Sequence, residues 1–175
     1  MKILKTKFKG TFKIKHKKNF DKRGYFVRDF CKETFKKKNI KFEVKQTNFS
    51  YNKKMATLRG FHYQKKPFSE AKIVSCLKGK LLLVLLNVNK SSKNYLKHIK
   101  FVLKENDNTS ILISKECATA FLTLKKNTLV LYYMSDIYKK NKGIGIRYND
   151  PKLNLKWPVK PKIISVRDNN FTNLE

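Results

Sequence analysis

Short apolar segments separated by polar turns recur along the whole chain. In many of them apolar and polar residues alternate with a period of two, which is typical of β-strands. The longest apolar run, residues 81–86, has the length of a strand. The pattern predicts strands at residues 5–15, 25–30, 42–50, 58–64, 72–77, 80–88, 96–103, 109–113, 118–124 and 129–134.

Helices play a small part in this pattern. One short helix is expected at residues 31–39, ending at Asn39. Many short strands with turns between them predict an all-β sandwich, barrel or jelly roll, in which a small ligand binds at the mouth. Glycine and proline are few and no stretch reads as an interdomain linker, so we expect a single domain over residues 1–175.

Reactive side chains concentrate around the predicted strand 58–64. This strand carries Arg59 and His62, and Lys72 begins the next one. Alternation places Arg59 and Phe61 on one face of the strand and His62 on the other. We expect His62 and Lys72 to lie on neighbouring strands and to point into one cavity. A base beside a cation suits removal of a proton next to a carbonyl, although lone titratable residues are often structural.

The net charge is the most unusual feature of the composition. It is +30 at pH 7, from 42 Lys and Arg against 12 Asp and Glu, which invites a nucleic-acid interpretation. The charge is nearly all lysine and is spread along the chain, whereas nucleic-acid sites favour arginine for bidentate contacts. Nucleic acid is therefore not expected to be the primary partner. The few arginines are candidates for specific roles: Arg23, Arg28, Arg59, Arg147 and Arg167.

The sequence carries no signature of a membrane, metal or disulfide protein. No apolar run is long enough to span a bilayer, and no apolar signal core follows the N-terminal charges. Three cysteines without a CxxC pair suit a reducing compartment, so we expect a cytoplasmic location. Three histidines without HxH or HxxxH spacing argue against a metal site, and neither a metal nor a cofactor is expected.

An ordered set of short motifs runs through nearly the whole chain. The set resembles the dTDP-4-dehydrorhamnose 3,5-epimerase family over roughly residues 5–168. The motifs are Asp21-x-Arg23-Gly24-x-Phe26, Gln46-x-Asn48-x-Ser50, Leu58-Arg59-Gly60-x-His62-Tyr63-Gln64, Ala71-Lys72, Leu77-Lys78-Gly79, Tyr132 with Tyr138, Asn149-Asp150-Pro151, Trp157-Pro158 and Ser165-x-Arg167-Asp168.

The resemblance implies both a fold and an activity. The fold is a cupin-type jelly roll (a double-stranded β-helix), usually a homodimer without a metal. The substrate is a nucleotide-diphosphate sugar of the 4-keto-6-deoxyhexose type, epimerised at C3 and C5 for deoxysugar biosynthesis.

The resemblance assigns catalytic roles to four residues. His62 is the base that removes a proton next to the C4 ketone, and Asp168 orients its imidazole and stabilises the protonated form. Lys72 stabilises the negative charge that develops on O4. Tyr138 returns a proton from the opposite face, which inverts the centre.

Further residues are implied to bind the substrate. Arginine forks suit the oxygen atoms of the diphosphate, and the other side chains suit the sugar and the rest of the nucleotide. Ordinary structural interpretations stay open, such as a core position for Tyr132, a solvated turn for Tyr138 and a turn cap for Asp168. The substrate-binding candidates are Arg23, Phe26, Gln46, Asn48, Arg59, Tyr132, Arg167 and Thr119.

Three positions depart from the family pattern. Thr119 stands where a second active-site His is expected, and Leu82 and Leu83 stand where an Asp near the catalytic Lys is expected. The loss of that carboxylate removes support for the charge of Lys72. Arg28 replaces a Glu expected near the nucleotide base, so these residues do not specify thymine.

Three hypotheses follow from the matches and the departures. The first is a 3,5-epimerase acting on a dTDP-linked sugar. The second is a relative that inverts a single carbon or uses another nucleotide sugar, such as a UDP or GDP sugar, and Thr119 and Leu83 favour it. The third is a non-catalytic basic cupin that binds an anionic ligand or nucleic acid.

Overall fold

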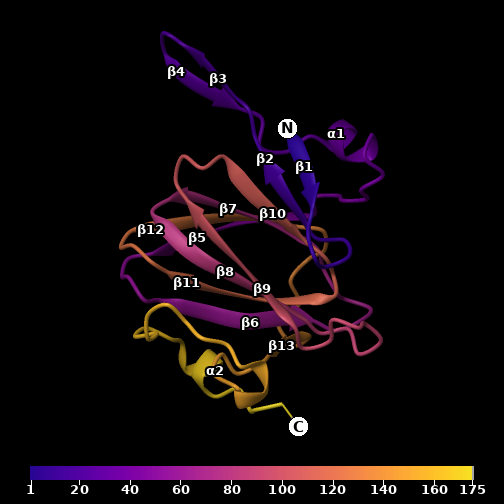
Figure 1. The fold of residues 1–175 in the computed structure, drawn as a ribbon, viewed down its shortest axis with the longest axis vertical. Coiled ribbons are helices and arrows are strands. Elements are labelled where there is room, and N and C mark those ends of the chain that lie inside the picture. The colour runs from indigo at the N-terminus through magenta and orange to yellow at the C-terminus, as the bar shows by residue number, and fades with distance from the viewer. Residues whose placement is uncertain (175) are drawn as a thin grey trace.

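The computed structural model describes residues 1–174, whose body is formed by two antiparallel sheets (Figure 1). One sheet has six strands in the order β1-β2-β10-β7-β12-β5, and the other has five in the order β13-β6-β11-β8-β9. The predicted all-β fold is confirmed. The strands of the two sheets are β1 (Lys2–Lys5), β2 (Phe12–Lys15), β5 (Gln46–Asn52), β6 (Leu58–Gln64), β7 (Lys72–Lys78), β8 (Lys80–Asn87), β9 (His98–Lys104), β10 (Thr109–Ile113), β11 (Cys117–Thr123), β12 (Thr128–Met134) and β13 (Gly143–Gly145).

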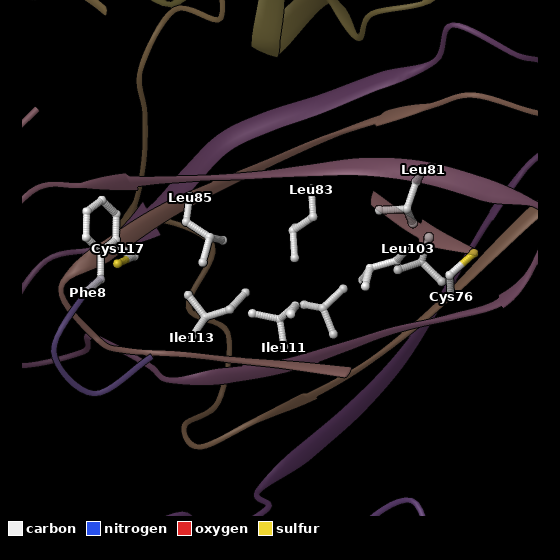
Figure 2. Close-up of a cluster of buried hydrophobic side chains, with 11 residues drawn as sticks. Phe8, Cys76, Leu81, Leu83, Leu85, Leu103, Ile111, Ile113 and Cys117 are labelled. Atoms are coloured by element: carbon white, nitrogen blue, oxygen red, sulfur yellow. The ribbon is translucent and has the colours of Figure 1, made fainter. Parts of the chain in front are cut away.

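Strand β8 shows why the chain folds into two layers. Its side chains Leu81, Leu83 and Leu85 point toward the six-stranded sheet, where they meet Ile111 and Ile113 of β10 (Figure 2). All five side chains are buried. Burial of one large aliphatic side chain contributes roughly 1.5–3 kcal/mol relative to exposure. This interdigitated layer is therefore a main source of the stability of the sandwich.

The outer faces of the sheets are covered as well. The alternate side chains of β8, among them Leu82 and Leu86, pack against a C-terminal segment that includes Leu153 and Trp157. This second contact explains why β8 is apolar from Leu81 to Leu86, because both of its faces are buried there. On the other sheet, a third apolar cluster that includes Phe35 covers β2, β7 and β10.

The helices are short and serve mainly as connections. They are α1 (Lys32–Lys36), the 3₁₀-helix η1 (Pro151–Leu153) and α2 (Val166–Asn169). Helix α2 begins after Ser165, whose hydroxyl accepts a hydrogen bond of 3.1 Å from the backbone N–H of Asp168. No helix within residues 1–174 combines the length and the apolar character needed to cross a membrane.

A two-stranded hairpin, β3 (Lys18–Asp21) with β4 (Gly24–Val27), projects away from the sandwich (Figure 1). Its turn is closed by Asp21, whose carboxylate accepts a 2.8 Å hydrogen bond from the backbone N–H of Arg23. Three aromatic side chains of the hairpin are largely exposed: Phe20 by 75%, Tyr25 by 54% and Phe26 by 62%. The hairpin thus presents an apolar surface that the rest of the chain leaves uncovered.

The sequence pattern fails in several places. It misses β3 entirely, and the strand predicted at 25–30 and the helix predicted at 31–39 end early, as β4 and α1. The single strand predicted at residues 5–15 is wrong, because β1 and β2 are joined by a turn in which Gly10 adopts a φ of +74°. The strand predicted at 42–50 begins later, as β5, because Phe42 is buried with the cluster that contains α1. Strand β13 was not predicted, since two glycines among its three residues leave no alternating pattern.

Candidate active site

A cavity of about 330 Å³ lies between the two sheets. Its walls come from β5, β7 and β12 of one sheet and from β6, β8, β11 and β13 of the other. Val74, Leu83 and Val130 line it and also belong to the core, so the cavity adjoins the apolar layer of the sandwich. The predicted site residues that line it are Gln46, Asn48, Arg59, His62, Lys72, Thr119, Tyr132, Tyr138 and Arg167.

His62 and Lys72 share this cavity but reach it from opposite sheets. His62 belongs to β6 of the five-stranded sheet, and Lys72 belongs to β7 of the six-stranded sheet. The prediction that they lie on neighbouring strands is therefore wrong, although the predicted common cavity is present. A sugar ring bound between the sheets would have the imidazole and the ammonium on different walls.

A β-bulge in β6 brings Arg59 and His62 to the same cavity. Between these residues β6 has one residue more than its partner β11, which shifts the alternation of side chains. The predicted placement of Arg59 and His62 on opposite faces is wrong for this reason. Gly60 lies in the bulge with a φ of +110°, and a Cβ atom there would lie 2.7 Å from the Cα of Ala120. The close approach of the two strands requires glycine.

The imidazole of His62 is bound to a carboxylate from the far end of the chain. Its Nε2 lies 2.8 Å from Oδ1 of Asp168, and the backbone N–H of Gly60 donates to Oδ2 at 2.9 Å. Burial alone would raise the pKa of Asp168, but the hydrogen bonds from His62 and Gly60 hold this pKa below its usual value. Asp168 is therefore a buried carboxylate behind His62, whose own side chain is 39% exposed.

The ammonium of Lys72 has a carboxylate partner that the sequence prediction misses. Nζ of Lys72 lies 2.8 Å from Oε1 of Glu70, and Gln64 donates from Nε2 to Oε2 of Glu70 at 3.1 Å. Leu83 lines the cavity where the family pattern leads us to expect an Asp, so the negative charge comes from Glu70 instead. The spacing Glu70-x-Lys72 was the available signal, because residues two apart in an extended chain share a face.

Tyr138 lies in the loop between β12 and β13, and three side chains hold this loop beside the cavity. Arg167 donates from Nη1 to the Tyr138 hydroxyl at 3.1 Å. Gln46 accepts a 2.9 Å hydrogen bond from the backbone N–H of Tyr138. Gln64 accepts one of 2.8 Å from the next backbone N–H, that of Lys139. These contacts anchor the backbone at Tyr138 and give its hydroxyl one partner, Arg167, although the residue is 43% exposed.

Other lining residues are also held by specific contacts. Arg59 donates from Nε to Oδ1 of the buried Asn52 at 3.0 Å, which leaves the end of its guanidinium group for a ligand. Burial raises the pKa of Tyr132, while the charge of Arg59 opposes that rise. Thr119 donates from its hydroxyl to the carbonyl oxygen of His62 at 3.4 Å.

Two predicted binding residues lie away from the cavity. Arg23 and Phe26 are on the projecting hairpin. The Arg23 side chain is 90% exposed, and its Nη2 lies 2.6 Å from Oδ2 of Asp21. Phe26 and Arg28 line a smaller hollow of about 220 Å³. The fold therefore does not bring Arg23 and Phe26 together with the other candidates within one chain.

The functional groups that line the cavity, together with Asp168 behind His62, are suited to acid–base chemistry. It combines an imidazole on a buried carboxylate, an ammonium and a phenol hydroxyl. Within residues 1–174, no three His, Cys, Asp or Glu side chains are grouped so that they could hold a metal ion. Together these acid–base groups can remove a proton next to a carbonyl and return it. A jelly roll with such a cavity belongs to the class of acid–base isomerases.

Comparisons with known proteins agree with this class. The sequence profile of the dTDP-4-dehydrorhamnose 3,5-epimerase family matches residues 5–175. The dTDP-4-dehydrorhamnose 3,5-epimerase of Sinorhizobium fredii is 29% identical over 162 residues, or 92% of this chain and 83% of that protein. The structure of the Bacillus anthracis dTDP-4-dehydrorhamnose 3,5-epimerase with TDP and PPi bound has a TM-score of 0.95 at 26% identity, over 99% of both chains. The structure of the Legionella pneumophila dTDP-6-deoxy-D-glucose-3,5-epimerase with dTDP-4-keto-L-rhamnose has a TM-score of 0.89 at 27% identity, over 95% of this chain and 89% of that one.

The chain belongs to the dTDP-4-dehydrorhamnose 3,5-epimerase family. This confirms the resemblance found in the sequence and the predicted cupin-type jelly roll. The protein is an isomerase of the epimerase class.

Proposed function

We propose that the protein epimerises a dTDP-linked 4-keto-6-deoxy sugar by moving protons at the carbons next to its C4 ketone. The observation that carries this proposal is the placement of the His62–Asp168 pair and Lys72 on opposite walls of one cavity. The ligands of two relatives support it, since one binds TDP and PPi and the other binds dTDP-4-keto-L-rhamnose.

His62 begins the reaction as the general base. Its free ring nitrogen takes the proton from C3 or C5, and the electron pair of that C–H bond forms the C=C bond of an enolate, which places negative charge on O4. Asp168 stabilises the imidazolium that results, because its carboxylate already lies 2.8 Å from Nε2. General-base catalysis of this kind contributes about 10²-fold to 10⁴-fold in rate.

Lys72 stabilises the enolate. Its ammonium lies in the cavity wall and donates a hydrogen bond to O4 as the negative charge develops there. The positive charge is already in the cavity wall when the substrate binds, so the protein does not have to rearrange to stabilise the enolate.

Tyr138 completes the inversion. Its hydroxyl delivers a proton to the face of the ring opposite His62, and the double bond returns to a single C–C bond. Arg167, which donates to this hydroxyl at 3.1 Å, stabilises the phenolate that remains. The proton taken up by His62 later returns through solvent to Tyr138.

The remaining lining residues bind the substrate. The guanidinium group of Arg59 contacts the diphosphate, for which a planar fork of donors is well suited. Arg167, whose Nη1 and Nη2 donate to Tyr138 and to the carbonyl oxygen of Gly143, adds its positive charge for the diphosphate. The sugar and the rest of the nucleotide are contacted by side chains with amide or hydroxyl groups. These side chains are Gln46, Asn48, Thr119 and Tyr132.

A homodimer is part of the proposal, because one chain leaves two binding residues outside its cavity. Arg23 and Phe26 lie on a hairpin whose exposed aromatic rings suit burial against a second copy. We infer that the hairpin brings them to the cavity of the partner subunit. A mixture of the Arg23→Ala and His62→Ala variants tests this, since a heterodimer then regains one intact cavity. No recovered activity in the mixture would contradict this arrangement.

A cytoplasmic location is also part of the proposal. The three cysteines are free thiols, two of them buried. Free thiols suit a reducing compartment.

The second candidate is inversion at a single carbon or action on another nucleotide sugar. It is favoured because Thr119 and Leu83 line the cavity where the family pattern leads us to expect a His and an Asp. Arg28 likewise stands where a Glu is expected. The test is to supply 4-keto-6-deoxyglucose linked to dTDP, UDP and GDP, and to determine the product configuration by NMR coupling constants. Double inversion with the highest kcat/KM for dTDP is expected. Single inversion would establish the second candidate, and no conversion of any substrate would overturn both.

A further inference from the structure

Glu70 carries a buried charge that the proposed reaction does not use. It is the one acidic side chain among the described residues that line the cavity, and it is only 3% exposed. Glu70 lies in the connection between β6 and β7, just before the strand that carries Lys72. A buried carboxylate is costly unless its oxygen atoms are paired. The contacts of both oxygens therefore indicate what the residue does.

Both carboxylate oxygens of Glu70 are engaged. Oε1 lies 2.8 Å from Nζ of Lys72, and Oε2 accepts a 3.1 Å hydrogen bond from Nε2 of Gln64. Gln64 is itself fixed, because its Nε2 donates to the carbonyl oxygen of Phe68 at 3.0 Å and its Oε1 accepts from the N–H of Lys139 at 2.8 Å. The carboxylate is thus held by Lys72 and by Gln64, whose amide is itself anchored to two backbone groups.

Among the described residues that line the opposite wall of the cavity, none supplies a second carboxylate to Lys72. The side chains of β8 that face the interior of the sandwich are Leu81, Leu83 and Leu85, and Leu83 lines the cavity. The other carboxylate of the site, Asp168, is engaged by His62 and Gly60.

We propose that Glu70 is a positioning residue for Lys72, which fixes the ammonium at the point where O4 of the enolate receives its charge. The inference rests on the proposed function of Lys72. A lysine side chain has a flexible stem, so a fixed carboxylate removes rotamers that point away from the substrate. One N–H of the ammonium is occupied by Glu70, and two stay available for the substrate.

Stability alone does not account for this pair. A buried ion pair adds little net stability, because the desolvation of both charges offsets their attraction. The Lys72 side chain is 14% exposed and lines the cavity, which places the pair at the site of the chemistry.

The test compares Glu70→Gln with Glu70→Asp and with Glu116→Gln, which makes the same change at an exposed position. Glu70→Gln keeps the shape of the side chain and removes its charge. We expect kcat to fall about tenfold to a hundredfold, as for a displaced catalytic group. KM should change little, and Glu70→Asp should recover part of kcat. Glu116→Gln should match the wild type.

A second-site variant separates positioning from folding. In the Glu70→Gln background, Leu83→Asp supplies a carboxylate from the opposite wall, and we expect it to raise kcat above that of Glu70→Gln alone. A purely structural role predicts a lower melting temperature with an unchanged kcat per folded enzyme, and that result would overturn the inference. If Glu70→Gln does not fold, the same comparison is made between Glu70→Asp with and without Leu83→Asp.

Lys72→Met separates the proposed role of Lys72 in the reaction from the inferred role of Glu70 in positioning it. Full activity of Lys72→Met would overturn the proposed role of Lys72 and the inference with it. An inactive Lys72→Met beside a Glu70→Gln variant with the wild-type kcat would overturn the inference alone.

Discussion

Nε2 of His62 lies 2.8 Å from Oδ1 of Asp168, although the two residues are 106 positions apart in the chain. The other oxygen of Asp168 accepts the N–H of Gly60, and the α2 turn fixes its backbone through Ser165. The imidazole is therefore held in one orientation from behind. A base in a fixed orientation needs less rearrangement to reach a carbon acid.

Asp168→Asn should retain the fold and lose most of the activity. The amide occupies the same volume but does not stabilise an imidazolium, so we expect kcat to fall about 10²-fold to 10⁴-fold. Steady-state kinetics on the variant, with its melting temperature as the measure of folding, checks this. Asp107→Asn is the control, because Asp107 forms only a surface pair with Lys104. Wild-type kinetics for Asp168→Asn would exclude the carboxylate from catalysis.

Tyr138→Phe should separate proton removal from completed inversion. His62 still removes the substrate proton in this variant, so exchange of that proton with solvent continues while product forms slowly. We expect the rate of inversion to fall about tenfold or more below the rate of exchange, in keeping with the loss of a general acid. Both rates are read from the same NMR time course. Equal losses in the two rates would remove the assigned role of Tyr138.

Arg59→Ala should weaken the binding of nucleotide diphosphates. A charge-assisted hydrogen bond contributes about 1.5–3 kcal/mol, so the dissociation constant for dTDP should rise about tenfold to a hundredfold. Calorimetric titration with dTDP measures this change. Lys54→Ala removes a positive charge from an exposed position five residues earlier in the chain and serves as the control. Equal affinities of the two variants would mean that general charge, rather than Arg59, binds the diphosphate.

His16 should make the stability of the protein depend on pH. Its Nδ1 donates to the carbonyl oxygen of Arg28 at 3.3 Å, and its Nε2 lies 2.6 Å from the hydroxyl of Ser110 and 3.4 Å from Oδ1 of Asp29. Burial lowers the pKa of His16 more than the nearby Asp29 raises it.

The sign of the effect follows from this lowered pKa. The unfolded chain takes up the proton first, so stability present at neutral pH is lost as the pH falls through about 6.5. The melting temperature of the wild type should decrease from pH 7.5 to about pH 5, and His16→Gln should flatten this decrease. Thermal denaturation over this range is the measurement. Identical slopes for the two proteins would contradict a lowered pKa of His16 in the folded protein.

Much of the fold follows from local patterns in the sequence. Strands such as β6 and β12 were predicted closely because apolar residues mark their buried faces and polar turns bound them. The failures occur where local pattern carries little information. Strand β13 is held by pairing with β6 alone, and the turn at Gly10 divides a segment that alternates on both sides.

The sequence predicted those residues of the candidate site that belong to a recognisable motif and carry a reactive side chain. His62, Lys72, Tyr138 and Arg167 were found from their motifs, and the structure brings them to one cavity. Contacts between residues on different strands could not be predicted from the sequence. The partnership of Gln64 with Glu70 depends on how the connection between two strands folds back, and the bulge in β6 depends on a close approach by β11.

Deuterium exchange tests the central claim most directly. A solution of dTDP-4-keto-6-deoxyglucose in D₂O is followed by proton NMR with the wild type and with His62→Ala, and substrate binding by the variant is measured separately. The account predicts that the C3 and C5 proton signals disappear with the wild type, and that both persist with His62→Ala although the substrate still binds. Continued exchange at either carbon with His62→Ala would contradict the claim that His62 is the base.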